Sequence, residues 1–411
     1  MKDFIELELN IKLRLITMFI ALGAFSTVEG SMTIYYNQHM GVGITGILLI
    51  IGSIVSFLTG LLAGHWSDLH GRRPMIVSGN LIAFIGMLFA ILANTLFFNP
   101  WLTFIGFMLE SFGSGLCGTS LEAMVVDLTD SESRKKVYAL QYWMINLAIA
   151  FGAALSGWLF RDYFDELLML IAVAYLTNLI ITFWGIRETF QPVKHHKTHQ
   201  SNIFKAYFQV SKDKIFMIYM VSLIGGSMFN SAVSFFLPVH LSSTFRTTNV
   251  LGMQVYGQRM LTIMLMLNTI LVIIFMPIIR QFTKNWSTKN GIVIGTTLEG
   301  AGLVLALFSH SFSMEMIAIL LDTSGEMIAV AFLQVLTANL MKQDAAGVYT
   351  GAVSITYPIA NFIAGMVVSG TMVYGDYGLG VVMIFVTLLT IFPALIALKM
   401  HHQRLLKLIN R

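Results

Sequence analysis

The stretch GHWSDLHGRRP, residues 64–74, is a short charged segment between two long apolar runs. The runs, at 44–65 and 75–95, hold almost no charge. Each is long enough to cross the roughly 30 Å hydrocarbon core of a bilayer as a helix. The stretch therefore predicts two transmembrane helices joined by a charged turn at the membrane surface.

The same pattern continues along the whole chain of 411 residues, of which 56% are hydrophobic and 11% charged. A typical soluble domain contains about 25% charged residues, so the composition excludes a soluble globular protein. We predict an all-α membrane protein with twelve transmembrane helices, at 14–37, 44–65, 75–95, 101–126, 137–160, 167–187, 215–240, 256–280, 290–309, 314–340, 346–372 and 378–399.

The basic residues predict the orientation of these helices, because Lys and Arg near helix ends stay cytoplasmic. With the N-terminus inside, every Lys and Arg except Arg161, Arg246 and Arg259 falls in a terminus or a cytoplasmic connection. We therefore expect a multi-pass protein with both termini cytoplasmic. The basic loops then lie beside anionic membrane lipid, and we expect no nucleic-acid partner.

A repeat relates the two halves of the chain at an offset near 212 residues. MLESFG at 108–113 aligns with LLDTSG at 320–325, so that Glu110 matches Asp322 and Gly113 matches Gly325. MIVSG at 75–79 similarly resembles GIVIG at 291–295. An even number of spans separates the copies, so the halves have the same topology, as in transporters whose halves rock around a site between them.

The longest polar interruption, RETFQPVKHHKTHQSNIFKAYFQVSKDK, divides the spans six and six. It predicts three parts: an N-terminal six-helix half at 1–187, a cytoplasmic linker at 188–214 and a C-terminal six-helix half at 215–411.

The opening stretch resembles the loop motif G-x-x-x-D-x-x-G-R-K/R of the major facilitator superfamily, through Gly64, Asp68, Gly71, Arg72 and Arg73. A closer resemblance, to LmrP-type multidrug/proton antiporters of Gram-positive bacteria, lies in SMTIYYNQHMGVGITGILL (31–49), ALQYWMINLAIAFGAALSGWLFR (139–161), FLPVHLS (236–242) and YGQRMLTI (256–263). The resemblance implies a major facilitator fold in a bacterial cell membrane and exchange of drugs for protons.

The resemblance also implies that the motif residues Gly64, Asp68, Gly71, Arg72 and Arg73 form a conformational switch. Arg72 is expected to pair with Asp127, because related transporters have an acid at that place. We expect Asp68 to meet a helix N-terminus or an amide group of the other half in the outward-open state, where the helix dipole favours a negative charge.

Seven acids in or at the ends of the predicted spans are candidate functional residues, because a carboxylate costs on the order of 2.5 to 3.5 kcal/mol at the bilayer centre. They are Glu29, Glu110, Glu122, Asp127, Glu299, Asp322 and Glu326. No Lys or Arg is expected deep in a span, and Arg259 comes nearest. An acidic interior without basic compensation favours cationic or neutral apolar substrates.

Acids retained in an apolar environment are candidates for loading and unloading protons. We assign proton coupling to Glu326, Asp127, Glu122, Glu29 and Asp322. For each, a structural carboxyl hydrogen-bonded to a neighbouring helix stays open. Glu110 lies toward the outer end of its helix, and the span of Glu299 is usually peripheral in this fold, so both are expected to be structural.

The chain departs from the LmrP-type pattern at Gln141 and Ser234, where that family has acids. A glutamine cannot release a proton, although it can hydrogen-bond; Glu29 and Glu122 are expected to compensate. Ala148, Gly152 and Ser156 recur every four residues and should allow close helix approach. The expected substrate-binding residues near a central cavity are Glu326, Gln141, Tyr142, Trp143, Asn146 and Tyr357.

These patterns together predict a secondary active transporter that exports lipophilic, cationic compounds in exchange for protons by alternating access, as a monomer. The sequence has no nucleophile motif and no phosphate-binding loop. We therefore expect no enzymatic activity, no cofactor and no metal, with the proton gradient as the energy source. A proton-coupled carrier for one defined solute or lipid stays open, as does a non-transporting membrane enzyme or sensor.

Overall fold

A computed structural model describes residues 7–189, 208, 210–250, 252–341, 349 and 352–409. The chain forms two compact units, Met1–Lys194 and His195–Arg411. Most of the predicted linker, 188–214, lies outside the described residues.

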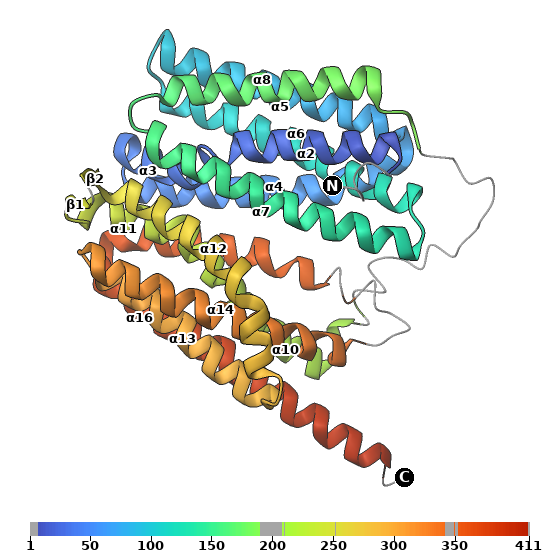
Figure 1. Cartoon of the computed structure of the whole chain (residues 1–411), viewed down its shortest axis with the longest axis vertical. Helices are drawn as coiled ribbons and strands as arrows, with labels where there is room; N and C mark the ends of the chain where they lie inside the picture. The colour runs from blue at the N-terminus through green and yellow to red at the C-terminus, as the bar shows by residue number, and fades with distance from the viewer. Residues whose placement is uncertain are drawn as a thin grey trace. The chain divides into compact units, whose positions relative to one another are not determined.

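The first unit consists of long helices that follow the predicted spans and extend past them at the ends (Figure 1). The helix that begins at Pro100 shows how the local sequence determines a helix start. The Asn99 side chain accepts hydrogen bonds from the backbone N–H groups of Trp101 and Leu102, and Pro100 occupies the first helical position. The helices are α2 (Leu9–Phe25), α3 (Glu29–Met40), α4 (Val42–His70), α5 (Arg72–Thr95), α6 (Pro100–Leu128), α7 (Ser131–Leu159) and α8 (Phe164–Gly185).

The second unit is also helical, apart from one short hairpin that the sequence did not predict. In the hairpin, Thr248 pairs with Val255 and Val250 with Met253. The elements are α10 (Lys214–Ser231), η1 (Ala232–Phe236), α11 (Leu237–Thr244), β1 (Thr248–Val250), β2 (Met253–Val255), α12 (Gly257–Thr283), α13 (Thr288–Phe308), α14 (Phe312–Leu340) and α16 (Thr356–Ile409).

The helices confirm an all-α membrane protein. Within the described residues, ten helices are long and apolar enough to cross a membrane. Two of them lie within α16, where Gly375 has a non-helical conformation with φ of 62°. The remaining two predicted spans coincide with α6 and α7.

Glycines bring two helix pairs into backbone contact, one pair in each unit. A Cβ on Gly79 of α5 would lie 2.5 Å from the carbonyl oxygen of Gly113 on α6. A Cβ on Gly325 of α14 would lie 2.6 Å from the carbonyl oxygen of Gly295 on α13. Small residues allow such approach of membrane helices. The sequence repeat, which aligned Gly79 with Gly295 and Gly113 with Gly325, thus corresponds to a repeated packing geometry.

The first predicted span is not one continuous helix, as the sequence suggested, because residues 26–28 form a turn between α2 and α3. The predicted small-residue stripe of α7 packs against this break. A Cβ on Gly152 would lie 2.5 Å from the Ser26 Cβ, and the hydroxyls of Ser156 and Ser31 are 3.0 Å apart. The expected close helix approach is confirmed, and its partner is the interrupted helix.

The first helix of the second unit is also irregular, because the π-helix η1 separates α10 from α11. Pro238 stands at the start of α11. Proline lacks a backbone N–H and clashes with the preceding turn, which explains the local widening of the helix. Interrupted helices at corresponding positions of two halves are a common feature of transporter binding regions.

Candidate functional site

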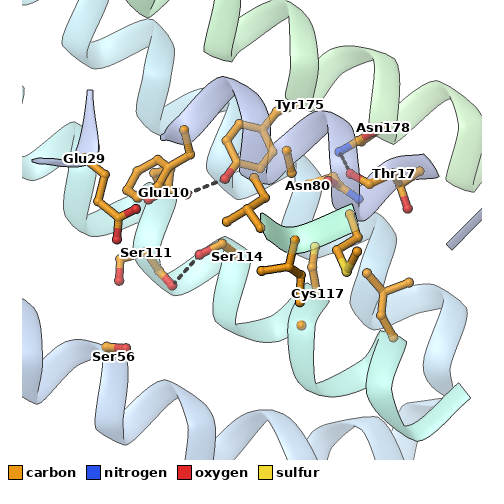
Figure 2. Close-up of a pocket in the computed structure, with 17 residues that line it drawn as sticks. Thr17, Glu29, Ser56, Asn80, Glu110, Ser111, Ser114, Cys117, Tyr175 and Asn178 are labelled. Carbon is orange, nitrogen blue, oxygen red and sulfur yellow. Dashed lines mark hydrogen bonds between the residues drawn. The ribbon is translucent and has the colours of Figure 1, made fainter. Parts of the chain in front are cut away.

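The first unit contains an open cavity of about 380 Å³ among α2, α3, α4, α5, α6, α7 and α8. Met18, Leu22 and Phe25 form part of its apolar wall. Figure 2 shows Glu29 and Glu110 near one end and Thr17 and Asn178 at the other. The polar lining residues are Thr17, Glu29, Ser56, Asn80, Glu110, Ser111, Ser114, Tyr175 and Asn178.

Two carboxyl groups face this cavity from different helices. Glu29 lies in the first turn of α3, directly after the break. Glu110 of α6 is 2% exposed and accepts a hydrogen bond from the Tyr175 hydroxyl of α8. The two carboxyl groups lie close enough to interact electrostatically. The sequence identified Glu29 as a site residue, whereas it assigned Glu110 a structural role and did not reveal Tyr175.

Arg14 corrects the expectation that no basic residue lies deep in a span. Its side chain is 3% exposed and forms an ion pair with Glu122, whose side chain is 46% exposed. Its Nη1 donates to the Gln141 side-chain oxygen at 2.9 Å and its Nε to the Leu121 carbonyl at 2.8 Å. Because α2 begins at Leu9, Arg14 lies inside the helix rather than at its edge. Glu122 is thus a paired acid.

Three carboxyl groups gather in the second unit, on α13 and α14. Glu299 and Asp322 are each 7% exposed, and Glu326 is half-buried. Each interacts electrostatically with at least one other member of the group. A Cβ on Gly325 would lie 2.1 Å from the Glu299 backbone nitrogen, so glycine at this position permits the close approach of the two helices. The sequence identified Asp322 and Glu326 but placed Glu299 at the periphery.

Asn268 of α12 fixes one member of this carboxyl cluster, which we define as Glu299, Asp322 and Glu326. Its Nδ2 donates to the Glu326 Oε2 at 2.9 Å and to the Thr323 hydroxyl at 3.1 Å. Among the described residues, none of the ion pairs involves a member of the cluster. Like charges repel strongly in an apolar medium, so the charge state of each of these carboxyl groups depends on that of its neighbours.

The loop motif forms a compact charge cluster at one end of the first unit. The Arg72 Nε donates to Asp127 Oδ2 at 3.1 Å, so the predicted contact is present. The Arg72 Nη1 also donates to Asp68 at 2.5 Å and to the Ser67 hydroxyl at 3.1 Å. One guanidinium group therefore joins both acids of the predicted switch. Gly64 lies on α4 with only an ordinary contact nearby.

Glu188, a residue that the sequence did not single out, completes this cluster from the end of α8. Its two carboxylate oxygens accept hydrogen bonds from the backbone N–H groups of Arg72 and Arg73, at 3.0 and 3.1 Å. These are the first residues of α5, where backbone N–H groups lack helical partners. Gly71 has φ of 98°, and a Cβ there would lie 2.5 Å from Glu188. The N-terminus of α5 is thus capped by a carboxylate distant in sequence.

Among the described side chains, Trp143, Asn146 and Tyr357 do not line the cavity of the first unit, to which α7 contributes Ile145. Trp143 and Tyr357 are 59% and 49% exposed. Asn146 is half-buried, and the side chain of Tyr142 lies outside the described residues. The part of the chain that the structure describes contains no group of His, Cys, Asp and Glu arranged to hold a metal ion.

The fold and these clusters can be compared with known proteins. The family model of the major facilitator superfamily matches residues 14–365. The chain belongs to the major facilitator superfamily. Like other members of this superfamily, the protein is a membrane transporter, and it is not expected to be an enzyme.

Two curated relatives show which kinds of major facilitator proteins are similar in sequence. A protein of Planococcus maritimus named "Na(+), Li(+), K(+)/H(+) antiporter" is 26% identical over 387 residues, covering 89% of this chain and 90% of its own. The "Multidrug resistance protein MdtH" of Proteus mirabilis is 23% identical over 336 residues, covering 81% and 79%. The relatives are thus named for alkali-cation exchange in one case and for drug resistance in the other.

Solved structures support the fold. A transporter of the POT family in complex with 5-aminolevulinic acid gives a TM-score of 0.73 at 15% identity, covering 96% of each chain. A peptide transporter in complex with sulfate gives 0.75 at 13% identity, covering 96% of this chain and 94% of the other. At such identities the likeness concerns the fold alone.

Proposed function

We propose that this major facilitator protein exports lipophilic, cationic compounds from a bacterial cell in exchange for protons, by alternating access of its two halves. Both termini face the cytoplasm, as the distribution of Lys and Arg predicts. The proton gradient supplies the energy, the protein works as a monomer, and it needs no cofactor.

The observation that carries the proposal is the carboxyl cluster of the second unit. Glu299, Asp322 and Glu326 lie together, and among the described residues no basic side chain neutralises them. A buried group of acids that interact with one another can take up protons from one side of a membrane and release them to the other. Glu326, held by Asn268, is the central proton carrier.

The other acids act in support of this step. Asp322 shares the protons of the carboxyl cluster, and Glu29 faces the cavity of the first unit. Glu122 and Asp127 adjust their pairing with Arg14 and Arg72 as the halves move. The motif residues Gly64, Asp68, Gly71, Arg72 and Arg73 determine which conformation is favoured, while Gln141, Tyr142, Trp143, Asn146, Tyr357 and Glu326 contact the substrate.

A second candidate is the exchange of alkali cations for protons. The specific observation in its favour is the name of the Planococcus maritimus relative, "Na(+), Li(+), K(+)/H(+) antiporter". Carboxylate oxygens, which the cluster supplies, are the ligands that hard cations prefer. A proton-coupled carrier for one defined solute or lipid is a third alternative.

Proteoliposomes with an imposed pH gradient distinguish these functions. Purified protein is reconstituted with an acidic lumen and a trapped pH-sensitive dye, and candidate substrates are added outside. We expect several lipophilic cations to collapse the gradient. A collapse caused by Na⁺, Li⁺ or K⁺ but by no organic cation would establish alkali-cation exchange instead. A response to a single nutrient would show a dedicated carrier.

A further inference from the structure

We propose that the cavity of the first unit binds the charged head of an amphiphilic organic cation that carries N–H donors, such as a primary ammonium group, with Glu29 and Glu110 as acceptors. This inference rests on the proposed cation export and names its substrate class. It assigns the binding of the charged head to residues of the first unit.

The first argument is the charge of the cavity. Two carboxyl groups face it, and among the described residues that line it none is Lys, Arg or His. Neither Glu29 nor Glu110 takes part in an ion pair within the described part of the chain. An unneutralised acidic cavity attracts a cation and repels an anion.

A second and independent argument is an unsatisfied acceptor. The side chain of Asn178 is 1% exposed and lines the cavity. Its Nδ2 donates to the Thr17 carbonyl at 2.8 Å, whereas its Oδ1 is buried without a hydrogen-bond partner. A buried polar atom without a partner is costly, so a ligand that brings a donor is favoured here. Figure 2 shows Asn178 toward the end of the cavity opposite Glu29.

The lining determines which kind of cation fits. An alkali ion requires a close shell of oxygen ligands, but much of this wall consists of apolar side chains such as Leu22 and Phe25. The cavity of about 380 Å³ is of the size that holds small organic ligands. A quaternary ammonium group lacks N–H donors and would leave the carboxyl oxygens unpaired. An N–H-bearing head on an apolar body satisfies both parts of the lining.

The chain contains one cysteine, and it reports directly on this cavity. Cys117 lines the cavity, is 8% exposed, and lies 3.4 Å from the Ile76 carbonyl oxygen. A ligand in the cavity must therefore hinder alkylation of this thiol. The full-length protein can be used without introducing any reporter.

The test compares 4-phenylbutylammonium with its N,N,N-trimethyl homologue as protectants of Cys117 against N-ethylmaleimide. We expect the primary ammonium to protect at a concentration about tenfold lower than the homologue, because only the former donates hydrogen bonds to the carboxyl oxygens. In E29Q, we expect the protecting concentration of the primary ammonium to rise by about tenfold or more. E166Q, which removes an exposed carboxylate from α8 outside the cavity, is the matched control and should behave as wild type.

Equal protection by the two homologues, or unchanged protection in E29Q, would overturn the inference. If N-ethylmaleimide does not reach Cys117, calorimetric titration of wild type, E29Q and E166Q with the two homologues makes the same comparisons. Cys117 protection reports binding in the cavity, whereas collapse of an imposed pH gradient reports proton coupling, so the two measurements separate this inference from the proposed function. If the protein exchanges cations for protons but binds the cations independently of Glu29, the cavity site is refuted and the proposed antiport is not. If the cations bind in the cavity but are not exchanged for protons, the proposed antiport is refuted and the cavity site is not.

Discussion

At the residue scale, Arg14 differs most from the sequence-based expectation. It stands at the start of an apolar run, which suggested a position at the membrane edge. The structure buries it against Glu122 and Gln141, residues more than a hundred positions away. No local pattern could reveal this pairing. The pairing also explains why residue 141 can be a glutamine. Glu122 already balances the charge of Arg14, so Gln141 needs only to accept a hydrogen bond from it.

The Arg14 pairing predicts the effect of removing its acid. E122Q leaves a buried guanidinium without a charged partner, and because Glu122 is partly exposed we expect a loss of about 1–2 kcal/mol in the free energy of unfolding. The double variant E122Q/Q141E returns a carboxylate to Arg14 and should recover most of this loss. Thermal unfolding in detergent measures both; a single variant as stable as wild type would contradict the pairing.

Gly71 allows a second prediction at the same scale. G71A places a Cβ 2.5 Å from Glu188, whereas G41A has a similarly positive φ of 82° but no neighbour within 4 Å. Both variants strain the backbone, but only G71A also displaces the cap of α5. We expect G71A to lower Tm by several degrees more than G41A, equivalent to about 1–3 kcal/mol. Equal shifts in the two unfolding curves would show that Glu188 contributes nothing.

At the scale of elements, most helices could be predicted, because long apolar runs and charged turns mark them directly. The repeat aligned the glycines that form the contacts between α5 and α6 and between α13 and α14, but it did not predict those contacts. The break at residues 26–28 was not predicted, although the polar segment STVEGS at 26–31 interrupts the apolar run there. Glu299 was misplaced because its proximity to Glu326 depends on how closely two helices approach.

The helix contact beside the carboxyl cluster provides a prediction at this scale. G325A introduces a Cβ 2.1 Å from the Glu299 backbone nitrogen and must push α13 away from α14. We expect destabilisation of about 1–3 kcal/mol and impaired transport. G226A, in α10, meets no atom within 4 Å and is the matched control. If thermal unfolding and flux assays show G325A and G226A to be alike, the two helices are not in the contact described.

At the scale of the whole molecule, the acids separate into groups with different surroundings. Glu29 and Glu110 face a cavity in the first unit, the carboxyl cluster lies in the second, and Asp68 and Asp127 share Arg72 at the loop motif. The sequence supplied most of these residues as candidates. Their grouping required the structure, because each group joins different helices whose packing the sequence does not give.

The loop motif is predicted to control conformational exchange rather than binding. D68N removes a charged acceptor from Arg72 but leaves its contact with Asp127. We expect transport to fall by about tenfold or more, while the affinity for cations changes less than about twofold. Flux in proteoliposomes and equilibrium binding measure the two quantities. Normal flux through D68N would show that the motif determines only the orientation of the protein in the membrane.

The most direct test of proton coupling is transport by E326Q in proteoliposomes. The account predicts that E326Q no longer accumulates a cation in response to a pH gradient. It also predicts that E326Q still exchanges labelled for unlabelled cation at equal pH, because this exchange needs a conformational change but no proton step. E315Q, the same change three turns away on α14, should retain both activities. Gradient-driven accumulation by E326Q at the wild-type rate would contradict the account.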